Sequence, residues 1–390
     1  MIFLKKRMLR IFVFLLAILF VLALDAAALA KVQPTAAEIV EALPCASAIL
    51  MDAETGCVLF EQNADEALPP ASVTKIMTLL LIMEAIEAQR LSLTDTVTAS
   101  ANAASMGGSQ VFLKEGESMT VEDMLKSVII ASANDCAVAL AELLCGSEES
   151  FVAAMNARAA ELGMKNTHFE NTNGLDDTVQ NHVTSARDIA LMSRELIKYP
   201  KVLEYSGRWM DSIRDGAFGL TNTNRLVRYY RGCTGLKTGS TSRAGFCISA
   251  TAQRDGVSLI CVIMAAPTRD ERNATAAKLL DFGFANYTTF RAEAGERALP
   301  VIGGEEREVG VTWAPLSVTV PRGMAKQVQS ICEIPQSLRA PLRAGEPIGT
   351  VIYMLDGKEI GRVPIAVSED VDEISFTGLF RKILVRFLFI

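Results

Sequence analysis

The sequence predicts an α/β fold: an antiparallel sheet with a helical subdomain, followed by a small all-β sandwich domain and a C-terminal amphipathic helix. Three observations predict this order. Strand patterns at both ends of residues 46–265 enclose a helical middle, short apolar runs separated by turns fill the chain from about residue 292, and the last fifteen residues follow a helical period. A chain of 390 residues has room for two or three domains of about 150 residues each.

The first domain is bounded by strands and filled by helices. Residues 46–52 and 57–61 have the pattern of two strands joined by a tight turn, and residues 245–252 and 257–265 that of a hairpin with an Asp-Gly turn. Between these strands, apolar residues recur at three- and four-residue spacings, which is the helical period. The segments with this period are 76–86, 121–130, 136–144 and 150–162, and one more helix is expected over about 273–282.

The C-terminal part changes character twice. Residues 292–375 contain short apolar runs separated by turns, which is the pattern of a small β-sandwich. Residues 376–390 place seven large apolar side chains on one helical face, with Arg381 and Lys382 on the other and Arg386 at its edge. A basic amphipathic helix of this kind suits a membrane interface. The alternative is a helix that docks on the protein's own core.

The N-terminus has the pattern of a secretion signal over residues 1–30. Four basic residues precede an apolar run at 11–24, and Ala28-Leu29-Ala30 supplies the small-x-small cleavage pattern, so that Lys31 is the expected new N-terminus. The alternative is an uncleaved membrane anchor, although the run is short for a spanning helix of about 20 residues. We therefore expect an exported protein.

Composition narrows the class of function. Half of the residues are hydrophobic and 21% are charged, which excludes a disordered chain. The net charge of −7 argues against nucleic-acid binding, and two histidines exclude a site built on several imidazoles. The eight cysteines form no C-x-x-C pair, and several lie in apolar runs. We expect them to be mainly small buried residues, with disulfides as the alternative, and we expect no metal site and no cofactor.

Three short motifs carry the chemistry. Ser72 and Lys75 share one helical face just after Pro69-Pro70, so a desolvated neutral lysine could take the proton of the serine hydroxyl. Ser132-Ala133-Asn134 offers a second hydroxyl and an amide between two helical segments. Lys237-Thr238-Gly239 adds a cation and a hydroxyl on a strand, with a glycine that lets a substrate backbone approach the strand edge. A lone S-x-x-K pair is weak evidence, but the three motifs in this order are highly specific.

With these motifs, the sequence resembles the low-molecular-mass penicillin-binding proteins, which are serine-type D-alanyl-D-alanine carboxypeptidases. The resemblance covers nearly the whole chain after residue 30 and includes the β-domain and the terminal helix. It implies a domain of the penicillin-binding and β-lactamase type over residues 31–291, a C-terminal β-sandwich over 292–375 and a membrane-anchoring helix over 376–390. Ala133 departs from the S-D-N form of the second motif but fits the looser S-x-N form.

The resemblance also implies a role for each motif residue. Ser72 is the acylated nucleophile, Lys75 its general base, and Ser132 relays a proton toward the leaving amine. The substrate is held by Asn134 and Gly239 along its backbone, by the backbone N–H of Ser240 (with that of Ser72) at the oxyanion, and by Lys237, Thr238 and Arg272 at its carboxylate. Arg225 is a weaker candidate for the carboxylate, with a surface ion pair equally expected, and His182 is expected to be structural.

The implied function is removal of the terminal D-alanine from peptidoglycan pentapeptide stems through an acyl-enzyme that penicillin also forms. The expected partners are stem peptides, β-lactam antibiotics and membrane lipids, and the expected location is the outer face of the cytoplasmic membrane, as a peripheral protein. A β-lactamase shares the motifs, but its usual glutamate and asparagine four residues apart are missing, since Gly174 follows Glu170 at that spacing. A non-catalytic wall-binding scaffold is the alternative from another class.

Overall fold

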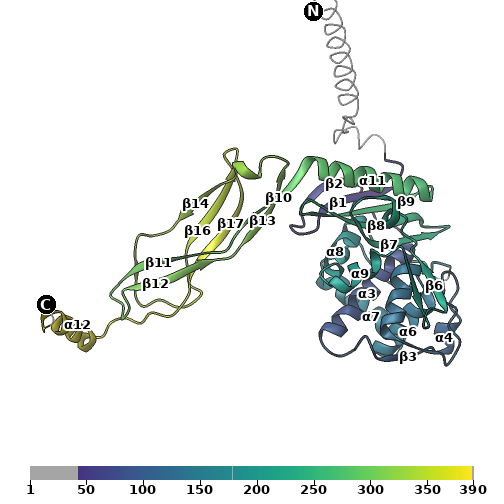
Figure 1. Ribbon diagram of the computed structural model, residues 1–390, viewed down its shortest axis with the longest axis horizontal. Helices are drawn as coiled ribbons and strands as arrows, with labels where there is room; N and C mark the ends of the chain where they lie inside the picture. Colours follow the sequence, from purple (N-terminus) through teal and green to yellow (C-terminus); the bar gives the residue numbers. More distant parts are fainter. Residues whose placement is uncertain (1–42, 178, 389–390) are drawn as a thin grey trace, which may run out of the picture. The chain divides into compact units, whose positions relative to one another are not determined.

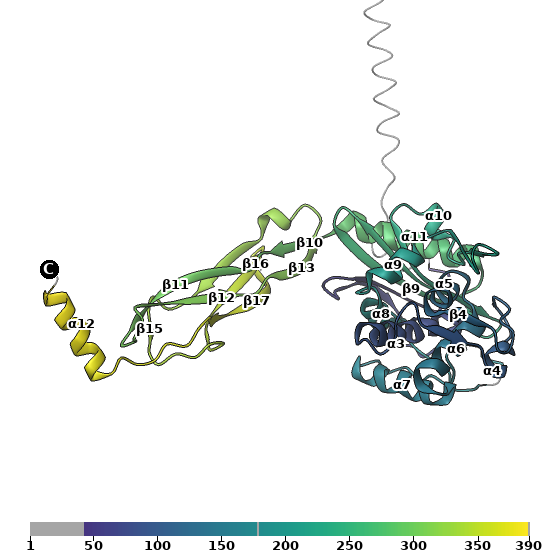
Figure 2. The same ribbon diagram turned by 60° about the horizontal axis from the view of Figure 1, so that its bottom comes forward.

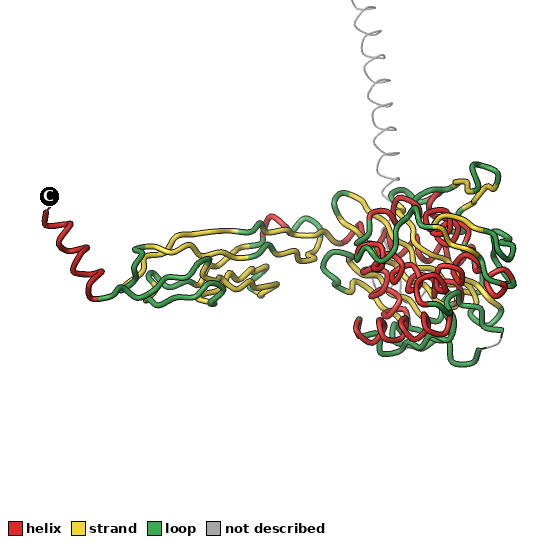
Figure 3. Tube along the Cα trace, turned by 90° about the horizontal axis from the view of Figure 1, so that it is seen from below, coloured by secondary structure: helices red, strands yellow, loops and turns green. Residues whose placement is uncertain are grey.

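The computed structural model describes residues 43–388, apart from residue 178. The expected signal peptide and its cleavage site therefore lie outside the described residues. Within them, the first domain combines helices with strands, and the second consists mainly of strands and their connecting loops (Figure 3). The helical middle between strands and the strand-rich C-terminal part agree with the sequence prediction, whereas two short hairpins inside the helical middle were not predicted.

A five-stranded antiparallel sheet forms the frame of the first domain (Figure 1). The spatial order is β2-β1-β9-β8-β7, so β7 is an edge strand. A strand at an edge keeps one row of backbone groups free to pair with a peptide. The strands are β1 (Ser47–Asp52), β2 (Val58–Gln62), β7 (Cys233–Thr241), β8 (Gly245–Arg254) and β9 (Val257–Ala266).

Helices cover both faces of this sheet. The helix α11 (Arg269–Asn286) packs on β8 and β9 from one side, and α8 (Ala186–Leu196) packs on β1 and β9 from the other, as Figures 1 and 2 show. In α8 the buried residues Ile189, Met192 and Leu196 recur at the helical period, so one face of the helix joins the core. The remaining helices of the domain are α3 (Lys75–Glu87), α4 (Ala101–Ala104), α5 (Val121–Lys126), α6 (Asn134–Cys145), α7 (Glu148–Glu161), α9 (Pro200–Ser206) and α10 (Leu226–Tyr229).

Two short helical turns interrupt the regular helices at the motifs. The 3-10 turn η1 (Ala71–Thr74) precedes α3, and the π-helical turn η2 (Ser127–Ala131) follows α5. The sequence predicts one helix over 121–130, but the structure changes from α to π at Ser127. Such π turns are rare and often lie at functional sites. Two small hairpins complete the domain, formed by β3 (Thr96–Thr98) with β4 (Ser118–Thr120) and by β5 (Met210–Ile213) with β6 (Phe218–Thr221).

Helix α11 begins four residues before the predicted start. Thr268 caps it: the Thr268 hydroxyl oxygen accepts from the backbone N–H of Glu271 at 3.1 Å, and the hydroxyl lies 2.8 Å from the Glu271 carboxylate. This is a threonine-x-x-glutamate pairing at a helix start, and a cap of this kind stabilises a helix by about 1 kcal/mol. The apolar periodicity used for the prediction begins only after this polar first turn.

The C-terminal domain contains two sheets that share one hydrophobic core, as the sandwich prediction requires. A two-stranded sheet pairs β10 (Tyr287–Ala292) with β13 (Leu316–Pro321), and its Phe290 and Leu316 pack against the core of the larger sheet. The larger sheet has the order β14-β16-β17-β12-β11-β15. Its strands are β14 (Gln329–Glu333), β16 (Pro347–Leu355), β17 (Lys358–Val367), β12 (Glu308–Trp313), β11 (Gly295–Ile302) and β15 (Leu338–Arg339), with the 3-10 turn η3 (Ala325–Gln327) between β13 and β14.

The chain ends in the helix α12 (Phe376–Leu388), where the sequence predicts one. Its apolar side chains are exposed: Phe376 and Phe387 keep 83% and 82% of their accessible area, and those of Leu379, Phe380 and Ile383 are also exposed. They do not dock on a hydrophobic core. No helix among the described residues combines the length and the apolar character needed to cross a membrane.

The cysteines correct one expectation. All eight lie within the described residues and are free thiols, so the disulfide alternative does not hold. Cys136, Cys247 and Cys261 are buried, as expected for small core residues, whereas Cys57 and Cys332 are exposed. Cys57 lies just before β2, and Cys332 lies in β14, whose five residues are all exposed. An apolar neighbour in the sequence does not reveal whether such a residue faces the core.

Candidate active site

Ser72 lies in η1, directly before α3. The two prolines before it end the preceding extended segment, and Ala71 adopts a left-handed φ of +49°, which turns the chain into the helix. Lys75 is the first residue of α3, and its Nζ lies 2.8 Å from Oγ of Ser72. The predicted proximity of serine and lysine is therefore present.

The amine of Lys75 is fully buried, and burial holds its pKa well below the usual range, with the nearby charge of Lys237 as the second cause. Its Nζ donates to Oδ1 of Asn134 at 2.6 Å and to the backbone carbonyl of Asn173 at 2.7 Å. A neutral amine has two N–H donors for these acceptors and one lone pair left, which faces the hydroxyl of Ser72. The geometry suits a base that accepts the proton of Ser72.

Ser132 sits at the junction of η2 and α6 in a left-handed conformation with φ of +65°. Its hydroxyl accepts a hydrogen bond of 2.9 Å from Nζ of Lys237, which lies on the opposite wall of the site. Asn134 begins α6, and both ends of its amide are engaged within the protein, since Nδ2 donates to the carbonyl of Gly107 at 2.7 Å. Asn134 is thus held in position on both sides of its amide group.

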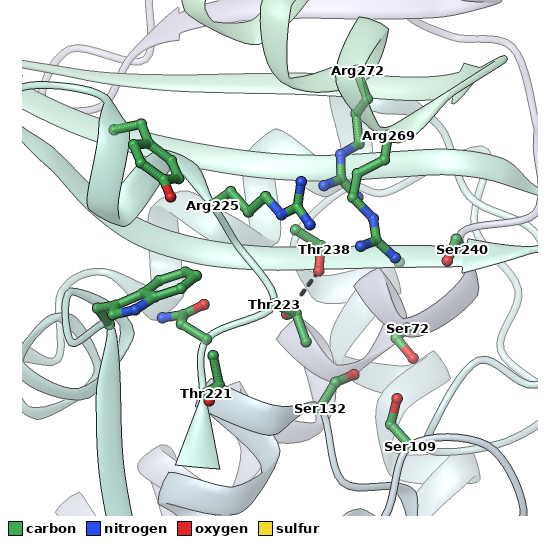
Figure 4. Close-up of a pocket in the computed structure, with 14 residues that line it drawn as sticks. Ser72, Ser109, Ser132, Thr221, Thr223, Arg225, Thr238, Ser240, Arg269 and Arg272 are labelled. Carbon is green, nitrogen blue, oxygen red and sulfur yellow. Dashed lines mark hydrogen bonds between the residues drawn. The ribbon is translucent and has the colours of Figure 1, made fainter.

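The third motif runs along the edge strand β7. Lys237 is fully buried, and burial lowers the pKa of its amine to about 7, with the charge of Arg272 as the second cause. A carboxylate beside it would favour the charged form again. The hydroxyl of Thr238 donates to that of Thr223 at 2.8 Å (Figure 4).

The structure requires glycine at position 239 for a reason that differs from the predicted one. A Cβ at this position would lie 2.8 Å from the carbonyl oxygen of Pro70 and 2.8 Å from the backbone nitrogen of Ser72. These distances are shorter than real Cβ contacts, so a side chain would push β7 away from η1. The glycine permits the close packing of the two segments that carry the first and third motifs.

These elements surround one cavity of about 640 Å³ (Figure 4). Ser72, Ser132, Thr238, Ser240 and Arg272 line it together with Gly239, whereas Lys75, Asn134 and Lys237 lie beneath its surface and contact the lining residues. All nine predicted site residues therefore meet at one place. Within the described residues, no group of three or more histidine, cysteine, aspartate or glutamate side chains is arranged to hold a metal ion.

Arg272, the last of the predicted site residues in the sequence, also has a pKa that burial and nearby charge shift. It lies in the first part of α11, and its guanidinium donates to Oδ1 of Asn273 at 2.9 Å and to the carbonyl of Cys247 at 3.3 Å. The pKa of Arg272 is lowered to about 10, with burial as the main cause and the charge of Arg269 as the second. An anion in the cavity would relieve both effects.

His182 is structural, as expected, and the structure shows which contacts give it that role. The backbone N–H of Glu170 donates to Nδ1 of His182 at 2.9 Å, which leaves the proton on Nε2, 2.7 Å from the hydroxyl of Thr74. That hydroxyl donates in turn to the carbonyl of Ala71 at 2.8 Å. The chain of three hydrogen bonds holds the left-handed residue that precedes Ser72. The spacing of the histidine from the motifs gives no signal for it.

We expect His182 to make stability depend on pH. Burial is the main cause that lowers its pKa from 6.5 to about 4, so the unfolded chain binds a proton between these values that the folded protein does not. The free energy of unfolding should therefore fall as the pH drops from about 6.5 to about 4, by roughly 3 kcal/mol at 1.36 kcal/mol per pKa unit. Urea unfolding across this range measures it.

The variant His182→Gln provides the control for this pH effect, because it removes the imidazole and keeps every other titratable group of the protein. The variant should be less stable at neutral pH and should lose the His182 part of the pH slope. Parallel slopes in both proteins would contradict a neutral, buried His182.

Comparison with known proteins decides the family. Residues 32–268, more than half of the chain, match the model of the Peptidase S11 family, described as D-alanyl-D-alanine carboxypeptidase. The chain belongs to this family. Residues 284–373 of the same carboxypeptidase match a second model, the C-terminal domain of penicillin-binding protein 5. The resemblance and the predicted fold of the two domains are thus confirmed.

Individual relatives agree with this assignment. The D-alanyl-D-alanine carboxypeptidase DacF of Bacillus subtilis is 41% identical over 344 residues, which cover 86% of this chain and 88% of the relative. The crystal structure of penicillin-binding protein 5 from Haemophilus influenzae has a TM-score of 0.76 and 33% identity, covering 85% of this chain and 98% of its own. Penicillin-binding protein D2 of Listeria monocytogenes, solved in an ampicillin-bound form, has a TM-score of 0.58 and 33% identity over 62% of this chain and 98% of its own.

Proposed function

We propose that this D-alanyl-D-alanine carboxypeptidase removes the terminal D-alanine of peptidoglycan stem peptides through an acyl-enzyme on Ser72. One observation carries the proposal: Nζ of Lys75, buried and with its pKa well below the usual range, lies 2.8 Å from Oγ of Ser72 at the wall of an open cavity. A serine becomes a nucleophile when an adjacent base takes its proton. The family and its named relatives supply the substrate class.

In the acylation step, neutral Lys75 accepts the proton of Ser72 while Oγ attacks the carbonyl carbon of the penultimate D-alanine. The negative charge on the carbonyl oxygen is stabilised by the backbone N–H groups of Ser72 and Ser240, where each such donor is typically worth about 3–4 kcal/mol. The proton then passes from Lys75 through the hydroxyl of Ser132 to the nitrogen of the leaving D-alanine. The peptide bond breaks, and an ester on Ser72 remains.

In the deacylation step, a water molecule attacks that ester and gives its proton to neutral Lys75. The oxyanion is held by the same two N–H groups. As the ester bond breaks, the oxygen of Ser72 recovers the proton from Lys75, and the shortened stem peptide leaves. Each residue returns to its starting state, so the reaction consumes one water and no cofactor.

The cations on the β7 side bind the terminal carboxylate of the substrate in this proposal. The Lys237 amine and the buried Arg272 guanidinium are both depressed in pKa, and a carboxylate stabilises their charged forms. The hydroxyl of Thr238 adds a donor at the surface of the cavity. The backbone of the stem peptide lies along the free edge of β7, which is the usual way for a strand edge to bind an extended peptide.

Replacing Lys237 with alanine tests the carboxylate contact. Turnover of D-Ala-D-Ala peptides should fall about 10²–10³-fold, because a desolvated charge contact is lost. Methylation of the substrate carboxylate should cost the parent enzyme a similar factor and the variant much less, as kcat/KM for the free acid and the ester would measure. Equal losses in the two enzymes would show that Lys237 does not contact this group.

The family's β-lactam ligands fit the same proposal. A penicillin presents a carboxylate and a strained amide carbonyl, so it can occupy the carboxylate and acyl positions of a D-Ala-D-Ala end and acylate Ser72. An ampicillin-bound structure is known for a relative that is 33% identical. In the ester formed with penicillin, the expelled amine stays covalently attached to the acyl group. It therefore occupies the position from which water must approach the ester.

We propose further that the enzyme acts outside the cytoplasm and is held on the outer face of the cytoplasmic membrane by α12. Peptidoglycan is the substrate of the family, and residues 1–30 have the pattern of an export signal. The exposed apolar side chains of α12 contribute about 1.5–3 kcal/mol each when buried in lipid, before ordering costs. Arg381, Lys382 and Arg386 add roughly 1 kcal/mol each near an anionic surface.

A chain that ends at Glu373 tests this tether. It lacks α12 but keeps every residue of the active site and the strands of the C-terminal domain. It should bind penicillin at the rate of the full chain and should no longer sediment with vesicles containing anionic lipids. Binding to vesicles that survives the truncation would exclude α12 as the tether, and loss of penicillin binding would indicate that α12 supports the fold.

A further inference from the structure

Three arginines converge on one wall of the cavity, beyond Thr238 as seen from Ser72 (Figure 4). Arg272 and Arg269 come from the first turn of α11, and Arg225 precedes α10. Arg272 is buried, whereas the side chain of Arg225 is half exposed. Their charges act on each other, since Arg269 and Arg225 both contribute to the lowered pKa of Arg272.

This wall carries more positive charge than the protein neutralises. Arg225 has one acidic neighbour, Asp270, at 3.9 Å, and that carboxylate is 89% exposed, so water screens the pair strongly. Arg272 donates only to neutral oxygens, those of Asn273 and Cys247. Arg269 has no hydrogen bond and no ion pair with any residue that the structure describes. Three guanidinium groups therefore face a single, screened carboxylate.

The substrate of the proposed function supplies one further anion, its terminal carboxylate. If Lys237, Thr238 and Arg272 bind it, Arg269 remains without an anion and Arg225 has only the screened carboxylate of Asp270. They lie on the leaving-group side, and the cavity continues past them to Trp209 and Tyr229. Tyr229 is 71% exposed, and the guanidinium of Arg228 lies 5.4 Å from both aromatic rings. The methyl side chain of a leaving D-alanine would leave this part of the cavity empty.

We propose that Arg225 and Arg269 form a second anion subsite, which binds a second carboxylate on a leaving group larger than D-alanine. The inference rests on the proposed acyl-enzyme and uses the same steps. The peptide bond after the penultimate D-alanine breaks, its acyl half forms the ester with Ser72, its nitrogen takes the proton, and water releases the acid. Two leaving groups have this chemistry: a D-amino acid with an acidic side chain, and the acceptor stem peptide of a cross-link, whose diamino acid supplies the leaving nitrogen and whose C-terminus supplies the second carboxylate. In the second case the enzyme cuts cross-links.

A pair of isosteric substrates tests the subsite. An N-acylated peptide ending in D-Ala-D-Glu differs from one ending in D-Ala-D-Gln by the charge of its leaving side chain alone. The parent enzyme should prefer D-Glu in kcat/KM by about 10-fold at low salt, and the preference should shrink as ionic strength rises. In the double variant Arg225→Gln and Arg269→Gln, the ratio should approach 1. In Asp270→Asn it should increase, because Arg225 loses its competing carboxylate.

Two further measurements distinguish failure of the anion subsite from failure of the proposed function. Release of D-alanine and acylation by penicillin should change less than about threefold in the single variant Arg269→Gln, and their absence in the parent would contradict the proposed function itself. A cross-linked stem-peptide dimer then distinguishes the two leaving groups: cleavage that falls about 10-fold in the double variant indicates the cross-link, and a preference seen only with D-Glu indicates an acidic D-residue. A parent ratio near 1, or a ratio unchanged in the double variant, would overturn the subsite.

Discussion

Replacing Lys75 with arginine is expected to slow acylation by penicillin and by D-Ala-D-Ala peptides about 10²–10⁴-fold, which is the usual contribution of a positioned base. Arginine keeps the charge and the donors but cannot lose a proton near neutral pH. In the present structure, burial and Lys237 favour the neutral amine of Lys75, 2.8 Å from Oγ of Ser72. A guanidinium at this position could therefore not accept the hydroxyl proton.

Two further variants distinguish loss of the base from misfolding and from a general effect of the lysine-to-arginine change. Lys75→Met fills the buried site with an uncharged chain of similar length and should lose acylation as well, while its melting temperature shows whether the fold persists. Lys198→Arg makes the same chemical change on the surface, where the side chain is 61% exposed and pairs with Glu195, and should change nothing. Near-normal acylation in a folded Lys75→Arg would mean that another group is the base.

Replacing Ser72 with alanine is expected to reduce carboxypeptidase turnover by about 10⁶-fold, the order found when a serine hydrolase loses its nucleophile. The change removes one hydroxyl oxygen at the wall of the cavity. The amine of Lys75 keeps its hydrogen bonds to Asn134 and to the carbonyl of Asn173. The fold should therefore persist. Ser109→Ala is the matched control, since Ser109 also lines the cavity but has no proposed role. Comparable losses in both variants would show that the cavity, rather than Ser72, had been disturbed.

Much of the site could be predicted from the sequence because its chemistry is local. Ser72 and Lys75 are three residues apart on one helical turn, so their proximity follows from helical geometry alone. The contact between Ser132 and Lys237 spans 105 residues, and only the resemblance to a family indicated it. The antiparallel sheet followed from strands at both ends of the domain, whereas its strand order did not.

Other features depend on packing that no short pattern encodes. His182 and Thr74 are 108 residues apart in sequence, and their hydrogen bond depends on how a loop folds back on η1. The reason for Gly239 is the approach of β7 to η1, which the sequence does not reveal. The cysteines differ for a similar reason: Cys247 and Cys261, which lie in apolar runs, are buried as expected, whereas Cys57 and Cys332 face solvent.

The start of α11 shows the limit of periodicity. Thr268 and Glu271 form a recognisable cap, but the apolar periodicity begins later in the sequence. The helix predicted from periodicity therefore lacked the first turn. That turn carries Arg269 and Arg272, which line the cavity. A capping motif therefore locates the start of such a helix better than apolar periodicity does. This matters because functional side chains at a cavity often lie in the first turn.

The central claim, that Ser72 is the residue acylated in this carboxypeptidase, is tested most directly by mapping a labelled penicillin. The full chain would be incubated with the labelled compound, digested, and the modified peptide sequenced by mass spectrometry. The account predicts one adduct, on the peptide that contains Ser72, and none in folded Ser72→Ala. An adduct on another residue, or no adduct in folded parent protein, would contradict it.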